Sequence, residues 1–196
     1  SPAIEAMDIR TSFIERLPFA KRRFRAWLPF FPAAIESFDL RGYDLVVSSS
    51  HCVAKGVVPD PRAVHVSYVH TPMRYAWDLA PEYFHPARMG RLKRMAAPLV
   101  ASALRAWDAA AAPRVDAFVA NSAHVAARIA RYYGRAARVV HPPVDTEFFT
   151  PGDSAAPRTH LLAVSALVPY KAIEIACEAV RGLGVPLVVV GDGSER

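Results

Sequence analysis

Short runs of apolar residues, separated by segments with helical periodicity, constrain the fold of this chain more than any other feature. The runs lie at residues 43–48, 63–69, 115–120, 138–141, 161–167 and 187–190. A run of this kind, bounded by polar or turn residues, is typical of a strand buried in a parallel sheet. Apolar residues between the runs recur at a spacing of three to four, as on one face of a helix. Strand and helix therefore alternate, which predicts an α/β protein with a parallel sheet covered by helices.

Local signals place the ends of the predicted helices. Ser122 follows the run at 115–120 and is a good N-cap for a helix that extends through Tyr133, and Gly134 supplies its stop. A longer helix is predicted over residues 92–107, with one buried face along it. We expect that face to consist of Leu92, Met95, Ala96, Leu99, Val100, Ala103, Leu104 and Trp107.

The composition narrows the class of protein. The 196 residues are 53% hydrophobic and 21% charged, which is typical of an ordered globular protein. The net charge of +6 suits an acidic ligand or an anionic membrane surface. No zinc-finger, helix-turn-helix or RNA-binding motif occurs, so nucleic acid is not expected as a partner. Cys52 and Cys177 lie in apolar segments and are expected to be buried free thiols, and the His and Cys residues lack metal-ligand spacing.

Prolines divide the chain into two parts. Residues 142–159 contain Pro142, Pro143, Pro151 and Pro157, and they form a stiff linker. The linker separates residues 1–141, the latter part of one α/β domain, from residues 160–196, the beginning of another. We expect the chain to be the middle of a protein about twice this length, the size of two full α/β domains. It has no apolar run long enough to span a bilayer and no signal-peptide pattern, which predicts a cytoplasmic location.

Polar residues gather where the predicted strands end, and parallel sheets bind ligands beyond the carboxyl ends of their strands. Lys171 follows the run at 161–167 and, with Pro169, stands at the predicted beginning of a helix. A helix N-terminus presents free backbone N–H groups and the positive end of the helix dipole, which favours phosphate. Lys171 adds a full positive charge there. The sequence therefore predicts a phosphate-bearing ligand.

A series of sequence blocks occurs in one order along residues 40–193. The blocks are Tyr43-Asp-Leu-Val-Val-Ser-Ser-Ser-His51 with Ala54-Lys-Gly56, Tyr68-Val-His-Thr-Pro-Met-Arg74 with Trp77-Asp78, Trp107-Asp108, Arg114-Val-Asp-Ala-Phe-Val-Ala-Asn-Ser122, His141-Pro-Pro-Val-Asp145, Val164-Ser-Ala-Leu-Val-Pro-Tyr-Lys171 and Pro186-Leu-Val-Val-Val-Gly-Asp-Gly193. In this series the chain resembles the retaining glycosyltransferases of family 4, which have the GT-B fold of two facing Rossmann-like domains. The resemblance implies the latter part of the N-terminal, acceptor-side domain and the first βαβ unit of the C-terminal, donor-binding domain.

The resemblance also implies an activity. It predicts metal-independent transfer of a hexose, with retention at the anomeric carbon, from an NDP-sugar to a glycan or lipid-linked acceptor, with no cofactor. Mannose is suggested by the resemblance alone, with GDP-mannose as the donor. His70 matches the family's sugar-contacting histidine and is the predicted catalytic residue, which orients the donor sugar and stabilises the oxocarbenium ion. Among the strand ends of residues 40–125 the one acidic candidate is Asp78, on a loop, which favours a front-face mechanism over a carboxylate nucleophile.

Contacts to the substrates are predicted from the same resemblance. Donor contacts are expected from Ser165, Lys171, Gly191 and Gly193. The family usually has an Arg at the position of Ala166, so Lys171 should carry more of the diphosphate charge here. Acceptor or sugar contacts are expected from His51, Arg74, Tyr75, Asp78, Asn121 and Ser122. Loop packing is the alternative for residues 74–78, and helix capping is the alternative for Ser122.

A basic and aromatic stretch at residues 16–31 points to a surface partner. Between Arg16 and Arg25 it has five basic residues and no acidic one. A solvated face would explain it, but peripheral contact with an anionic membrane, at its inner face, is the sharper hypothesis.

Two alternatives to sugar transfer stay open from the residues alone. One is a GT-B nucleotide-sugar epimerase or hydrolase, and the other is a non-catalytic nucleotide-sugar-binding module.

Overall fold

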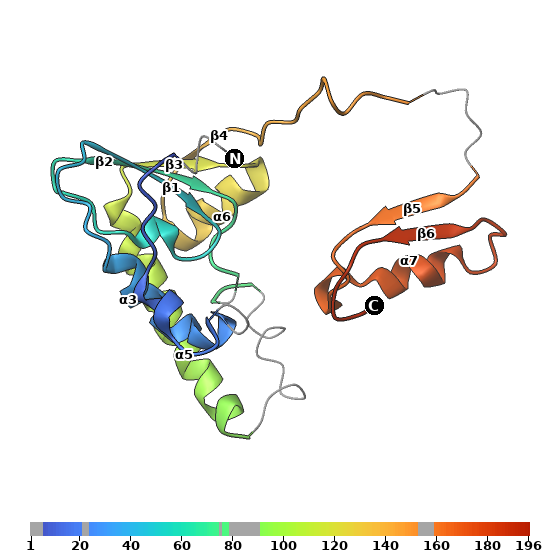
Figure 1. Ribbon diagram of the computed structural model, residues 1–196, viewed down its shortest axis with the longest axis horizontal. Helices are drawn as coiled ribbons and strands as arrows, with labels where there is room; N and C mark the ends of the chain where they lie inside the picture. Colours follow the sequence, from blue (N-terminus) through green and yellow to red (C-terminus); the bar gives the residue numbers. More distant parts are fainter. Residues whose placement is uncertain (1–5, 21–23, 75, 79–90, 153–158) are drawn as a thin grey trace. The chain divides into compact units, whose positions relative to one another are not determined.

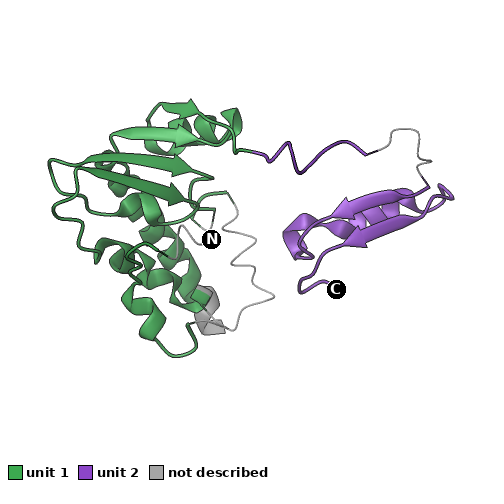
Figure 2. Ribbon diagram, turned by 45° about the horizontal axis from the view of Figure 1, so that its top comes forward, with its two compact units in different colours: residues 1–143 green, residues 144–196 purple. Residues whose placement is uncertain are grey.

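The computed structural model describes residues 6–20, 24–74, 76–78, 91–152 and 159–196. The chain forms two compact units, residues 1–143 and residues 144–196, each with a sheet of its own (Figures 1 and 2). Both units are built from parallel strands joined by helices. The predicted α/β class is therefore confirmed.

A four-stranded parallel sheet forms the centre of unit 1. Its strands are β1 (Leu45–Ser50), β2 (Val64–Val69), β3 (Ala117–Ala120) and β4 (Ala137–Val139), and they lie in the order β1-β2-β3-β4. Four of the predicted strands thus exist, although β1 and β3 each begin two residues later than predicted. The register aligns Ser49 with Tyr68 and Val69 with Ala120, so the carboxyl ends of neighbouring strands lie level with one another.

The described helical segments of unit 1 precede its first strand or connect its strands. They are the 3-10 turns η1 (Phe13–Arg16), η2 (Phe24–Phe30), η3 (Ala54–Gly56) and η5 (Ala112–Arg114), and the α-helices α3 (Phe31–Glu36), α5 (Arg91–Ala111) and α6 (Ala123–Tyr133). The predicted ends of α6 are confirmed. The Ser122 hydroxyl accepts a hydrogen bond from the Val125 backbone N–H at 3.3 Å, and Gly134 ends the helix in the left-handed conformation with φ of 63°.

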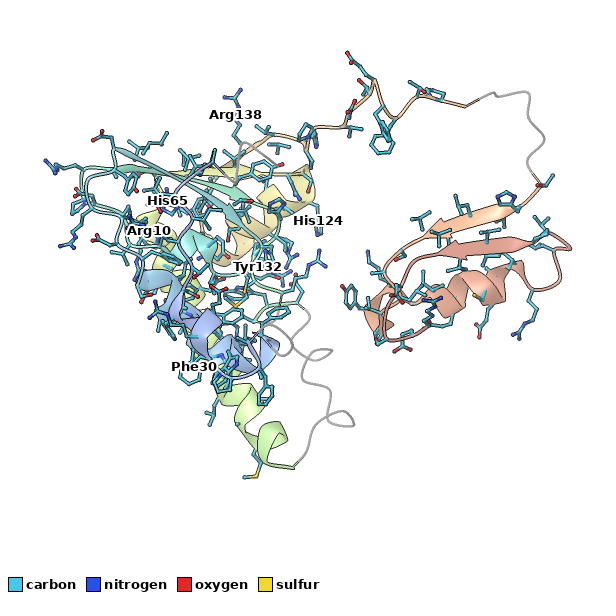
Figure 3. The ribbon with its side chains drawn as sticks, viewed as in Figure 1. Arg10, Phe30, His65, His124, Tyr132 and Arg138 are labelled. Atoms are coloured by element: carbon cyan, nitrogen blue, oxygen red, sulfur yellow. The ribbon has the colours of Figure 1, made fainter. Side chains whose placement is uncertain are left out.

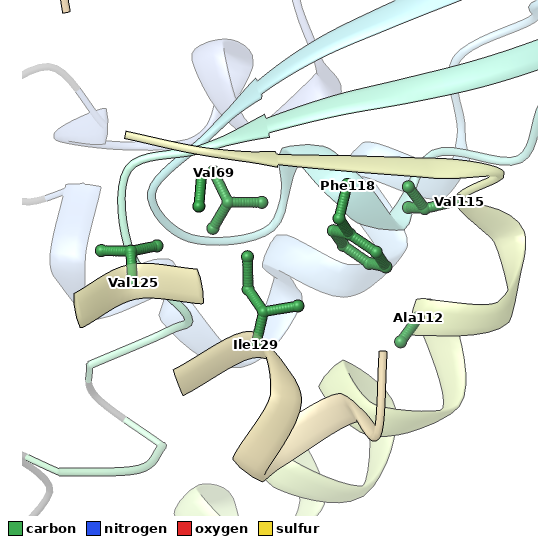
Figure 4. Packing of buried hydrophobic residues seen from close by; sticks show 7 residues of the cluster. Val69, Ala112, Val115, Phe118, Val125 and Ile129 are labelled. Carbon is green, nitrogen blue, oxygen red and sulfur yellow. The ribbon is translucent and has the colours of Figure 1, made fainter. Parts of the chain in front are cut away.

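One face of this sheet carries the core. Val69 and Phe118 pack against Val125 and Ile129 of α6, with Val115 at the edge of the same cluster (Figure 4). Every connection runs in the same direction along a sheet of consecutive strands, so right-handed crossovers place α5 and α6 on the same face.

The opposite face of the sheet is open. Leu45 and Val47 of β1 are 58% and 66% exposed, and Val64 of β2 is 50% exposed. Buried and open residues alternate along β1 and β2, because successive side chains of a strand point to opposite faces.

The predicted buried face of α5 is wrong in part. Met95 and Leu99 are 71% and 75% exposed, whereas Leu104 is buried as expected. The face that packs on the protein is instead formed by Ala97, Ala101, Leu104, Asp108 and Ala111. Its spacing of three and four is helical, but small side chains let α5 lie close, and a carboxylate occupies a position that periodicity alone reserves for an apolar residue.

Unit 2 is a βαβ unit. It consists of β5 (Leu161–Val164), the 3-10 turn η6 (Pro169–Lys171), α7 (Ile173–Val180) and β6 (Leu187–Val190), with the two strands parallel. Contrary to expectation, Lys171 ends a 3-10 turn instead of opening the α-helix. Ala172 separates the two segments in the left-handed conformation, with φ of 47°. The expectation of two buried thiols holds for Cys52 and is wrong for Cys177, which is exposed on α7.

Candidate functional site

A row of hydrogen-bonded polar residues crosses the carboxyl edge of the unit 1 sheet. Ser49 of β1 contacts His70 after β2 through Oγ and Nε2, 2.9 Å apart. The Asn121 side chain, after β3, donates from Nδ2 to the His70 carbonyl at 3.1 Å. His141, after β4, contacts the Asn121 carbonyl through Nδ1 at 3.1 Å. All four strands therefore contribute to one row, at the edge where parallel sheets bind ligands.

His70 is the most firmly held residue of this row. Its backbone N–H donates to the Ser50 carbonyl at 2.8 Å, and its ring lies edge-on to Tyr68 with 5.2 Å between the centroids. The Tyr68 hydroxyl in turn donates to the Val140 carbonyl at 3.0 Å. His70 is nevertheless exposed. Its imidazole is thus both oriented by the protein and open to a ligand.

The described residues 71–78 after His70 include both buried and exposed side chains. Met73 and Ala76 are fully buried, while Arg74 and Asp78 are exposed. Tyr75, a predicted contact residue, lies outside the described residues. The Asp78 carboxylate forms an ion pair with Arg128 and accepts a hydrogen bond from the Tyr132 hydroxyl, both on α6 (Figure 3 labels Tyr132). Of the predicted contact residues in this loop, Arg74 presents its guanidinium to solvent and Asp78 is engaged by the protein.

The remaining predicted residues of unit 1 lie beside the same edge. His51 follows β1 and is exposed, and Asn121 and Ser122 are half-buried at the beginning of α6. Ser122 caps α6 and also donates from its hydroxyl to the Asn121 side-chain oxygen at 3.1 Å. Asn121 therefore links the helix cap to His70, which the sequence blocks alone did not indicate.

A buried ion pair lies beneath the site. Lys55 of η3 and Asp108 of α5 are 1% and 0% exposed, with 3.0 Å between Nζ and Oδ1. Trp77 and Tyr133 both donate to the other oxygen of Asp108, from Nε1 at 2.7 Å and from the hydroxyl at 2.8 Å. Burial lowers the pKa of Lys55, an effect that the Asp108 charge opposes. The pair joins η3, which follows β1, to α5, and the Trp77 hydrogen bond to Asp108 adds the loop that follows β2.

Asp108 also acts on its titratable neighbours. Burial and the nearby Asp108 carboxylate together raise the pKa of the Cys52 thiol to about 12. Burial, the Asp108 charge and the hydrogen bond to Asp108 raise the pKa of Tyr133 as well. Both groups are therefore held neutral, and Cys52 is unsuited to act as a nucleophile at neutral pH.

A second polar cluster closes the base of unit 1. Glu36 accepts hydrogen bonds from Trp107 at 2.8 Å and from Arg114 at 2.6 Å, and Arg114 also donates to the Gly56 carbonyl at 2.8 Å. Burial would raise the pKa of Glu36, but these two donors hold it below its ordinary value. A Cβ on Gly56 would lie 2.4 Å from the Trp107 ring, so a larger residue there would require the ring to shift.

His65 is a buried histidine with no access to the edge. Its Nδ1 donates to the Arg114 carbonyl at 3.0 Å and its Nε2 lies 2.9 Å from the Ser48 hydroxyl. Figure 3 shows His65 among the strands of unit 1. Burial lowers its pKa, and the hydrogen bond to Arg114 offsets only part of that effect. Although it contacts a serine, its burial excludes a hydrolytic role.

Unit 2 brings the predicted donor residues to the carboxyl ends of β5 and β6. Gly191 and Gly193 lie against the backbone of residues 165–167, where an added Cβ would be 1.8 Å from the Ser165 carbonyl oxygen and 2.0 Å from that of Leu167. The Leu167 N–H donates to the Asp192 carbonyl at 2.9 Å. The absence of a Cβ thus lets the loop after β6 contact the loop after β5, which explains the two glycines without any ligand. Lys171 is exposed on the turn that follows.

Two further classes of feature were sought in the described residues. There, no group of three or more His, Cys, Asp or Glu side chains could hold a metal ion. Within that same part of the chain, every helix is too short or too polar to cross a bilayer.

Several residues of the site were not among the sequence predictions. Ser49 was missed because its role depends on the register of β1 against β2, although alignment of parallel strand ends could have indicated it. Arg128 and Tyr132 were missed because they lie on α6, far along the chain from Asp78, which they contact. Lys55 and Asp108 belong to sequence blocks quoted for the resemblance, but no local pattern predicts that they pair.

The fold and the site together define a class of protein. A Rossmann-like parallel sheet with a polar carboxyl edge, joined to a second βαβ unit, is the architecture of a GT-B fragment. The family model for Glycosyltransferase Family 4 matches residues 2–148, three quarters of the chain. The chain belongs to this family and is a glycosyltransferase. Comparison with curated proteins gives no match.

Proposed function

We propose that the protein transfers a hexose, with retention and without a metal ion, from an NDP-sugar to a glycan or lipid-linked acceptor. Membership of glycosyltransferase family 4 supports sugar transfer. The observation that carries the proposal is the row that holds His70 at the carboxyl edge of the sheet. Mannose, with GDP-mannose as donor, is the first sugar to test.

His70 is assigned the catalytic role. Ser49 orients its imidazole, and Asn121 engages its backbone carbonyl. A fixed dipole beside the anomeric carbon stabilises positive charge as it develops, and no reorganisation is needed at the moment of reaction. The leaving diphosphate then accepts the proton of the acceptor hydroxyl on the same face, since no free carboxylate is placed as a nucleophile among the described residues of this edge. His51 and Arg74 are assigned to the acceptor because both are exposed beside His70.

Unit 2 is assigned to the donor. Ser165, Gly191 and Gly193 lie together at the ends of β5 and β6, and Lys171 follows on η6. The exposed ammonium group of Lys171 would neutralise the leaving diphosphate. With Ala166 in place of the family's usual arginine, this charge is expected to carry most of that stabilisation. A charge-assisted contact contributes about 1.5–3 kcal/mol, or about tenfold to a hundredfold in affinity.

Binding of a panel of GDP-, UDP- and ADP-sugars, measured by calorimetry, tests the donor assignment. Lys171→Ala should weaken binding of the preferred donor about tenfold to a hundredfold, and Lys171→Arg should restore most of it. Arg181→Ala is the matched control, because Arg181 is an exposed cation at the other end of α7. Undiminished affinity in Lys171→Ala would refute the assignment. Release of free nucleotide at the same rate with and without acceptor would instead indicate a hydrolase.

We further propose that residues 16–31 contact an anionic membrane. Phe19 and Phe30 are 73% and 50% exposed, and Arg16 is exposed, while Lys21, Arg22 and Arg23 lie outside the described residues. Figure 3 shows Phe30 beside α5. Each basic residue near an anionic surface contributes about 1 kcal/mol, and exposed aromatic rings anchor at the interface. Co-sedimentation with phosphatidylglycerol vesicles at low salt should occur and should weaken at high salt. No sedimentation at low salt would end this proposal.

A further inference from the structure

Residues 71–78, which follow His70, are attached to α6 at two points by one arginine. Arg128 donates from Nη1 to the Thr71 hydroxyl at 2.7 Å, and its Nη2 pairs with Asp78. The Arg128 side chain is only 12% exposed, so neither contact is a loose surface pair. A single guanidinium therefore bridges the first and last residues of the segment 71–78.

The Asp78 end of the segment has a second attachment. The Tyr132 hydroxyl donates to Asp78 Oδ1, while Arg128 contacts Oδ2, so both carboxylate oxygens have partners in the protein. The Trp77 ring stacks on Tyr132 with 4.4 Å between centroids, and its Nε1 donates to the buried Asp108. A carboxylate engaged on both oxygens is poorly suited to read sugar hydroxyls. It is well suited to hold the loop.

The attachment determines what the loop presents. With Thr71 and Asp78 held to α6, and with Met73 and Ala76 fully buried, the exposed Arg74 lies between the two attached residues. His70 directly precedes Thr71, and its carbonyl binds Asn121 at the beginning of the same helix. α6 thus holds both His70 and the loop that carries Arg74.

We propose that Arg128, Asp78 and Tyr132 form a latch that positions His70 and Arg74 for substrate, with Arg128 and Asp78 as positioning residues instead of substrate contacts. The proposal rests on the proposed function only for the identity of the substrate. Breaking the latch should leave the sheet and its core folded, because the contacts lie at the edge of unit 1. It should free the loop and thereby weaken use of the acceptor.

Hydrogen exchange followed by mass spectrometry tests the latch without any substrate. In the wild-type chain the N–H groups of Ala76 and Trp77 both donate to the Met73 carbonyl at 3.2 Å. Arg128→Ala should raise their exchange rates at least tenfold and leave amides of β3 unchanged. Asp78→Asn, a milder change of the same shape, should raise them less. Arg105→Ala is the control for loss of an exposed arginine, and it should change nothing. Unchanged rates at Ala76 and Trp77 would overturn the proposal.

Transfer kinetics then separate a latch from a substrate contact. Arg128→Ala and Asp78→Asn should each lower kcat/KM for the acceptor at least tenfold and leave the affinity for the NDP-sugar unchanged. The double variant should have a kcat/KM no lower than that of the more impaired single variant, because both changes break the same ion pair. Arg128→Lys should recover part of the loss. Multiplicative losses in the double variant, or faster exchange with unchanged kcat/KM, would overturn the positioning role. Absence of transfer by the wild-type protein would sink the proposed function and leave the exchange experiment decisive for the latch.

Discussion

Removing the charge of Asp108 tests how unit 1 is held together. Asp108→Asn keeps the shape of the side chain and one oxygen acceptor for Trp77 or Tyr133, but it leaves the Lys55 ammonium group buried without a counter-charge. At the 3.0 Å separation the direct attraction is about 5.5 kcal/mol with an effective dielectric constant of about 20. Breaking one side of a buried pair typically costs about 3–5 kcal/mol. We expect the free energy of unfolding of unit 1 to fall by about 3–5 kcal/mol.

Urea unfolding followed by tryptophan fluorescence measures this change. All three tryptophans belong to unit 1, so the signal reports on that unit alone. The double variant Lys55→Met with Asp108→Asn should recover at least half of the lost stability, because no uncompensated charge then remains in the core. A loss below about 1 kcal/mol in Asp108→Asn would refute the reasoning, as would a double variant less stable than the single one.

Three further predictions concern other parts of the chain. Folding lowers the pKa of His65, so the unfolded chain binds a proton at a higher pH than the folded chain does, and the free energy of unfolding should fall as the pH drops below about 6.5. Urea unfolding at two pH values should show a smaller fall in His65→Gln than in the wild type. Gly191→Ala should destabilise unit 2 by about 3 kcal/mol through its clash with the Ser165 carbonyl, seen as faster amide exchange in β5; protection equal to wild type would contradict the close approach. Ala172→Gly should stabilise unit 2 by up to about 1 kcal/mol in the same exchange assay, because glycine tolerates the left-handed conformation; a loss of protection would argue against that geometry.

Sequence patterns were sufficient for features that depend on neighbouring residues. The strands of unit 1, the cap at Ser122 and the stop at Gly134 follow from apolar runs and local backbone chemistry. His70 and Asn121 could be placed at one edge because parallel strands end on the same side of a sheet. The exposed stripe of α5 could not be predicted, since Met95 and Leu99 have the same periodicity as a buried face. Which stripe packs is decided by what lies opposite the helix.

The sequence by itself determined the α/β class and the polar residues at the strand ends, because periodicity and helix caps are local properties, and its ordered motifs carried the resemblance to glycosyltransferase family 4. Only the tertiary structure decided which residues support that edge. The pairing of Lys55 with Asp108, of Ser49 with His70, and of Arg128 with Asp78 joins positions 21 to 53 residues apart. Such pairs depend on strand register and helix placement, and their contribution to stability depends on how deeply they are buried. Neither the placement nor the burial can be predicted from a local pattern in the sequence.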